Sequence, residues 1–143
     1  MIYMLDTNIC SYIIKNRPLE VLAKFKALKP DSCCISSITY AELKYWVARS
    51  KQLHEKSKNH GQPKVNAQII DGFVSNLDIM DFDAHAAEIY ADVRAWMEGR
   101  GLVVGGADLM IGSHAISLGL VLVTNNVKDF KNIPKIILEN WVA

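Results

Sequence analysis

The sequence predicts a layered α/β protein whose central sheet is mainly parallel. Short apolar segments alternate with longer segments of helical spacing along the whole chain, and this alternation is typical of β-α-β units. The apolar segments at 2–5 and 120–123 contain no polar residues, as expected of strands that are buried on both faces. At 143 residues, half of them hydrophobic, the chain is expected to form one domain, 1–143.

The first half of the chain is expected to form two strands and three helices. A strand at 2–5 is followed by helices at 9–15 and 19–28, a brief strand at 33–35 and a helix at 38–48. Residues 44–64 form a basic segment, with six lysines and arginines against Glu55, a net charge of 6 − 1 = +5. A solvated basic surface is the ordinary meaning of such a segment, and the chain is expected to leave the helix near 59–61.

The second half repeats the alternation. Helical spacing at 65–75 precedes a strand at 77–80, and Asp83 is well placed to cap a long helix that ends near Gly99 and Gly101. A loop at 102–106 leads into a helix at 107–118, which Gly119 stops. A buried strand at 120–123 and a last strand at 136–138 complete the expected sheet.

Composition excludes several classes of protein. The three cysteines are too few and too irregularly placed for a disulfide framework, and they lack the spacing of a zinc site. No apolar run is long enough to span a bilayer, and the apolar start has no basic leader. We therefore expect a cytoplasmic protein that is not bound to a membrane. A net charge of +1 argues neither for nor against nucleic acid.

Three acids stand where a parallel sheet would bring functional residues together: Asp6 after the first strand, Glu42 after the second, and Asp108 before the helix of the penultimate strand. Open α/β sheets bind ligands at the carboxyl ends of their strands. Each acid also has a structural explanation. Asp6 could cap the next helix, Glu42 ends a Thr-x-x-Glu capping-box pattern, and Asp108 lies in the first turn of a helix.

Convergence of these acids would require a cation. Ionised carboxylates repel one another, and a charge at an apolar rim is costly unless it is compensated. A hard divalent cation resolves this repulsion. Ligands that offer only oxygen favour Mg²⁺ or Mn²⁺ over zinc.

Four motifs in the same order resemble PIN-domain ribonucleases, and in particular the VapC toxins of bacterial toxin–antitoxin pairs. These motifs are Met4-Leu5-Asp6-Thr7-Asn8, Ser37-Ile38-Thr39-Tyr40-Ala41-Glu42-Leu43, Gly105-x-x-Asp108-Leu109-x-Ile111, and Leu122-Val123-Thr124-Asn125-Asn126-x-x-Asp129-Phe130 with the later Leu138-Glu139-Asn140-Trp141. The resemblance covers the whole chain. It implies a three-layer α/β/α fold and a metal-dependent nuclease.

The resemblance also implies site residues. Asp6, Glu42 and Asp108 match the catalytic, metal-binding acids. The family often has a fourth acid after the penultimate strand, where this chain has Asn126, with Asp129 three residues further on. Supporting positions are Thr7, Asn8 and Thr124. Gly112-Ser113 stands where relatives usually carry two alanines, and this difference is expected to be tolerated in helix packing.

The implied reaction is hydrolysis of RNA. The metal would activate water for in-line attack on the phosphate, leaving 5′-phosphate and 3′-hydroxyl ends. Cations of the basic segment, which is longer than in typical members, would contact the RNA backbone; they are Arg49, Lys51, Lys56 and Lys58. Some of the most similar VapC proteins cut tRNA.

The resemblance further implies a VapB-type antitoxin whose arginine reaches the acids, and a toxin homodimer within a larger toxin–antitoxin assembly. Two other functions are compatible with the residues. One is phosphotransfer through an aspartyl-phosphate at Asp6, although Thr7-Asn8 provides no second aspartate two residues on. The other is a binding module with a decayed site, which Asn126 keeps open.

Overall fold

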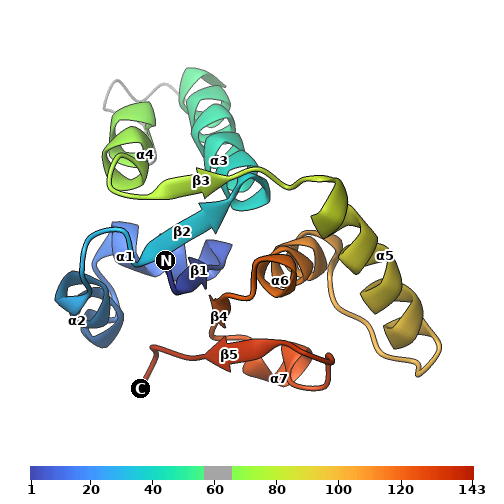
Figure 1. Ribbon diagram of the computed structural model, residues 1–143. Coiled ribbons are helices and arrows are strands. Elements are labelled where there is room, and N and C mark those ends of the chain that lie inside the picture. Colours follow the sequence, from blue (N-terminus) through green and yellow to red (C-terminus); the bar gives the residue numbers. More distant parts are fainter. Residues whose placement is uncertain (57–65) are drawn as a thin grey trace.

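The computed structural model describes residues 1–56 and 66–143 and has five strands and seven helices in these residues (Figure 1). The strands are β1 (Tyr3–Leu5), β2 (Cys33–Ser36), β3 (Asp78–Met80), β4 (Val121–Val123) and β5 (Ile137–Glu139). The helices are α1 (Thr7–Lys15), α2 (Leu19–Ala27), α3 (Ser37–Lys56), α4 (Ala67–Val74), α5 (Ala84–Glu98), α6 (Gly106–Leu118) and α7 (Val127–Phe130).

All strand pairs in the sheet are parallel, and the order is β3-β2-β1-β4-β5. The chain builds outward from β1 through β2 to β3, and then returns to the other side of β1 with β4. This reversal is a topological switch point, and the crevice outside the carboxyl ends of strands at such a point is where open α/β sheets bind ligands. Asp6 follows β1 and Thr124 follows β4 at this crevice.

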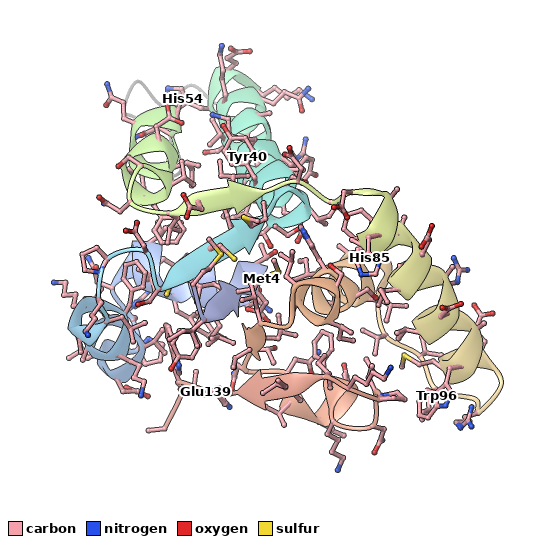
Figure 2. All side chains as sticks on the ribbon, in the orientation of Figure 1. Met4, Tyr40, His54, His85, Trp96 and Glu139 are labelled. Atoms are coloured by element: carbon pink, nitrogen blue, oxygen red, sulfur yellow. The ribbon has the colours of Figure 1, made fainter. Side chains whose placement is uncertain are left out.

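Alternate residues of the central strands enter two separate cores, one on each face of the sheet. Leu5 and Ile35 pack with α1, α3 and α4, whereas Met4 and Leu122 pack with α5, α6 and α7. Figure 2 labels Met4 on the central strand and Glu139 on the edge strand β5. Cys33 and Cys34 enter opposite cores, as predicted. The two cores confirm a three-layer α/β/α arrangement with a parallel sheet.

Several predicted boundaries were too short or misplaced. The helix predicted at 38–48 begins at Ser37 and continues to Lys56, because its inward face continues beyond Ala48 with the half-buried Ser50 and His54. The capping box at Thr39–Glu42 is wrong: the backbone N–H of Ile38 bonds the Ser36 hydroxyl instead. Helix α7 was not predicted, since four residues give no helical period. The expected break near 59–61 lies outside the described residues.

Helix α6 packs closely at Gly112. A Cβ at this position would lie 2.8 Å from Cε1 of Phe130, so glycine fits this packing, as predicted, whereas an alanine here would require the ring to move. The hydroxyl of Ser113 is buried and, within the described part of the chain, has no hydrogen-bond partner. Among the same residues, no helix is long and apolar enough to cross a membrane.

Candidate active site at the carboxyl edge of the sheet

Asp6 lies at the end of the central strand β1 and is only 5% exposed. It is the N-cap of α1, where its Oδ1 accepts the backbone N–H of Ile9 at 2.9 Å. Burial raises the pKa of Asp6 to about 6; hydrogen bonds from Thr124 and Ile9 oppose this rise, and the charges of Asp108 and Glu42 add to it. Asp6 is therefore both a structural cap and a carboxylate in a strongly negative environment.

Glu42 reaches the same place from α3. Its Oε1 accepts a hydrogen bond from the hydroxyl of Thr7, the residue after Asp6. The Thr7 hydroxyl also lies 3.3 Å from that of Thr39, which is fully buried. Thr7 therefore connects the start of α1 with α3 and fixes the direction of the Glu42 side chain.

Asp108 comes from the first turn of α6 and is half-buried. Burial raises its pKa, and the charges of Glu42 and Asp129 raise it further. A Cβ at Gly105 or Gly106, just before Asp108, would meet no atom within 4 Å. The approach to Asp108 from this side is open.

Asn126 and Asp129 act as a pair at the start of α7. The Asn126 side-chain amide donates to Oδ2 of Asp129 at 2.8 Å, and the backbone N–H of Asn126 donates to the Thr124 hydroxyl at 2.9 Å. The charge of Asp129, like that of Glu42, raises the pKa of Asp108. The Asn126 amide thus orients a carboxylate near Asp108, and a role for Asp129 as the fourth acid stays a prediction.

In the part of the chain that the structure describes, no lysine, arginine or histidine forms an ion pair with these four acids. The ion pairs found in residues 1–56 and 66–143 join Lys24 to Glu139, Lys44 to Asp71 and Arg94 to Glu98. Carboxylate oxygens are the ligands that Mg²⁺ prefers, so the donor chemistry fits a hard divalent cation.

The arrangement of the acids is not that of a closed metal site. Among the described residues, no group of three or more Asp, Glu, His or Cys side chains is positioned to hold a metal ion. Asp6, Glu42 and Asp108 are near enough to repel one another, and binding would require their side chains to move closer together. Convergence around one Mg²⁺-sized centre stays a prediction.

The remaining predicted site residues that the structure describes are exposed, unlike Asp6, Glu42 and Asp108. Asn8 is exposed on the first turn of α1. Arg49 is two helical turns along α3 from Glu42, about 10 Å, and Lys51 and Lys56 lie further out; all three cations are exposed. Lys58 lies outside the described residues.

Two polar links near the site were not predicted. The Asn140 amide donates to Oδ1 of Asn125 at 3.1 Å and ties the C-terminal segment to the loop that carries Thr124. Ser36 Oγ lies 2.9 Å from Nδ1 of His114, which is 1% exposed. The Leu138–Trp141 motif was the sequence signal for the link between Asn140 and Asn125. Ser36 and His114 are 78 residues apart, so the local sequence carried no signal for their contact.

The chain matches the PIN-domain family model over residues 3–136. It is 46% identical to ribonuclease VapC2 of Rickettsia felis over 99% of this chain and 98% of the relative. It is also 40% identical to the tRNA(fMet)-specific endonuclease VapC of Shigella flexneri, over 97% of both chains.

Solved structures agree with these relatives. A chain in the crystal structure of VapBC2 from Rickettsia felis bound to a promoter DNA fragment superposes with a TM-score of 0.83 at 44% identity, covering 99% of both chains. A chain of DNA-bound VapBC from Salmonella typhimurium gives 0.82 at 41% identity, covering 99% of this chain and 98% of that one. The protein therefore belongs to the PIN-domain family, within its VapC ribonuclease branch.

Proposed function

We propose that this chain is an endoribonuclease toxin that hydrolyses RNA with Mg²⁺ or Mn²⁺ held by Asp6, Glu42 and Asp108. The observation that carries the proposal is a group of carboxylates at a topological switch point, with Asp6 buried and Glu42 and Asp108 half-buried, and with no ion pair to a cation within residues 1–56 and 66–143. Relatives named as ribonucleases and as tRNA(fMet)-specific endonucleases support RNA, and tRNA in particular, as the substrate.

Each acid has a distinct role in this proposal. Asp6 is the rigid ligand, because the Ile9 N–H and Thr124 hold its carboxylate. Glu42 is positioned by the Thr7 hydroxyl, and Asp108 faces the open side. When bound, the cation would supply an activated water and neutralise charge on the phosphate. Asp129, oriented by Asn126, is the fourth acid near Asp108.

The competing functions are less consistent with the site. A phosphotransfer aspartate must be free to attack, whereas Asp6 caps α1 and is buried beside other acids that raise its pKa. A decayed site would have lost its fourth acid, whereas Asp129 lies near Asp108 and is held by Asn126. Hydrolysis of RNA uses all four carboxylates.

The proposed partner is a VapB-type antitoxin, and the proposed location is the cytoplasm. Structures of VapBC complexes of relatives support this partner. An antitoxin arginine could pair with two carboxylate oxygens at once and would compete with the cation for Asp6, Glu42 and Asp108. We also propose that the toxin forms a homodimer inside the larger complex.

Cleavage of tRNA(fMet) by the purified chain tests the enzymatic proposal. The wild type in Mg²⁺ should give products with 5′-phosphate ends, whereas EDTA or Asp6→Ala should abolish cleavage. Lys26→Ala is the matched control, since it changes an exposed residue of α2, a helix that carries none of the acids. Cleavage that persists in EDTA, or in Asp6→Ala, would contradict the proposal.

Expression in cells tests the partner. The wild type alone should arrest growth, and co-expression with the small reading frame beside its gene should restore it. Asp6→Ala should be harmless while still binding the partner in a pull-down. A wild type that is harmless and binds no such partner would refute the toxin role even if the nuclease activity is present.

A further inference from the structure

The face of α3 that carries Glu42 continues as an exposed stripe along the helix. Counting from Glu42, the positions i+3, i+7, i+10, i+11 and i+14 fall within about 100° of one another around the helix axis. They hold, in order, Tyr45, Arg49, Gln52, Leu53 and Lys56, and all five are exposed. This stripe, called the α3 stripe below, extends about 21 Å from Glu42.

Much of the remaining surface of α3 contacts the rest of the fold, although Ala48, Lys51 and Glu55 are exposed outside the stripe. Leu43 lies in the core under the sheet, and Lys44 pairs with Asp71 of α4 at 3.3 Å. Figure 1 shows α4 beside α3 on one side only, and in Figure 2 side chains extend from α3 on the side away from α4. Lys51 is about 180° from Glu42 around the helix and therefore lies off the α3 stripe.

Tyr45 is the large aromatic residue of the stripe, and its side chain is 60% exposed. Within the described residues its ring contacts no other aromatic ring or cation, in contrast to Tyr40, over which the Lys44 ammonium lies 5.7 Å from the ring centroid. Exposing an aromatic ring of this size has no structural benefit. One turn separates it from Glu42.

We infer that the α3 stripe binds unpaired RNA bases next to the scissile phosphate, with Tyr45 as a stacking platform and Arg49 as a phosphate contact. The inference rests on the proposed function and names the contacts that would select its substrate. Unstacked bases of RNA loops bind aromatic side chains flanked by cations. Beyond Glu42 the stripe contains Arg49 and Lys56 and no acid, so its charge is complementary to a phosphate backbone.

A protein partner is the competing occupant, and the stripe is less suited to it. Leu53 is the only aliphatic residue among the five, at 51% exposed, and it is flanked by Arg49, Gln52 and Lys56. Interfaces between proteins place apolar residues at their centre and have few lysines there. The stripe also begins at a candidate catalytic acid, where the substrate must lie.

The first experiment measures RNA binding in an Asp108→Asn background, so that the RNA is not cleaved. The probes are a labelled anticodon stem-loop of tRNA(fMet) and a blunt RNA duplex of the same length. Tyr45→Ala should weaken binding of the stem-loop about 10-fold and leave binding of the duplex unchanged. Tyr45→Phe should bind like the parent, whereas Tyr45→Leu, which is apolar but cannot stack, should resemble Tyr45→Ala.

The second experiment compares a cation of the α3 stripe with an exposed cation of another helix. Arg49→Gln should reduce the slope of log affinity against log salt by about 0.7, the value for one phosphate contact on a single strand. Lys26→Gln, which makes the same charge change at an exposed residue of α2 and so off the stripe, should leave this slope unchanged. Equal slopes for the two variants would overturn the role of Arg49.

Cleavage by the wild type separates this inference from the proposed function. If the wild type cleaves tRNA and a folded Tyr45→Ala binds and cleaves like it, the inference fails and the function stands. If Tyr45→Ala binds RNA normally but loses the antitoxin, the stripe is a protein interface and the inference also fails. If the wild type neither binds nor cleaves RNA, both fail.

Discussion

The acid cluster of Asp6, Glu42 and Asp108 and the Ser36–His114 pair are both polar and at least partly buried. Helix α6 contributes to each, through Asp108 and His114. In the pair, burial lowers the pKa of His114 and so favours the neutral ring, which bonds the Ser36 hydroxyl and the backbone of Asp81. In the cluster, burial raises the pKa of Asp6 and Asp108, and the acids repel one another. One group is satisfied by its own chain, whereas the other requires something from outside.

This difference separates structural from functional polar groups. A neutral group with every hydrogen bond made stabilises a unique packing. Charges that are buried without partners cost stability and are retained where a ligand compensates them. Removal of a group from the pair should therefore cost stability and little activity, and removal of an acid should do the reverse.

The largest expected effect is on cleavage by Asp108→Asn. The change removes one of several repelling charges and a cation ligand, so the rate on tRNA should fall more than roughly 100-fold while the free energy of unfolding stays equal or rises. Cleavage assays and urea unfolding of the same preparations measure both quantities. A variant that cleaves at the wild-type rate in Mg²⁺ would leave Asp108 with only a helix-start role.

The next effect is the pH dependence of stability in EDTA. Because the pKa of Asp6 is about 6 in the folded chain and 3.8 ordinarily, the folded state binds the proton more tightly. The free energy of unfolding should then fall as pH rises from about 4 to 6, by up to about 3 kcal/mol. Asp6→Asn retains the N-cap but has no carboxyl group to titrate, so its free energy of unfolding should not show the decrease that is due to Asp6. If the free energy of unfolding depends on pH in the same way in both proteins, Asp6 does not titrate as described.

Ser36→Ala tests whether the Ser36–His114 pair stabilises the fold without contributing to activity. The change leaves Nδ1 of His114 and the N–H of Ile38 without their partner, so the free energy of unfolding should fall by about 2 kcal/mol. At a temperature where the variant is folded, kcat should stay within about twofold of the wild type. A selective loss of kcat would mean that this pair belongs to the active site.

The smallest effect is expected at Ser113. Its buried hydroxyl has no partner in the described part of the chain, so Ser113→Ala should raise the free energy of unfolding by about 1 kcal/mol or less. Thermal unfolding of the two proteins in one buffer measures this difference. Destabilisation would indicate that the hydroxyl has a bound water or another partner.

The sequence was sufficient for the layered fold, because apolar strands and capped helices leave local patterns. Asp83 caps α5 and Gly119 ends α6 at φ 67°, both as predicted. The length of α3 was underestimated, because the second half of the helix is polar and basic and has no apolar residues at regular helical spacing. Only the half-buried positions of the structure, such as Ser50 and His54, show which side of this half faces inward. Short α7 left no period at all.

The site was only partly predictable for a similar reason. Motif order pointed to Asp6, Glu42 and Asp108, and the structure brings them near one another. The sequence left both Asn126 and Asp129 as candidates for the fourth acidic position, because the side-chain hydrogen bond that joins them is visible only in the structure. The link between Thr7 and Glu42 joins residues 35 positions apart, and such contacts follow from tertiary packing and leave no trace in local sequence.

Stabilisation by Mg²⁺ tests the central claim most directly, because it needs no RNA. In urea unfolding, Mg²⁺ at about 100 times its Kd should raise the free energy of unfolding of the wild type by roughly 2.7 kcal/mol. Ser36→Ala should gain the same increment from its lower baseline, and Asp6→Asn/Asp108→Asn should gain none. An equal increment in the double variant and the wild type would place the cation elsewhere, and no increment in a wild type that cleaves RNA in EDTA would contradict the account.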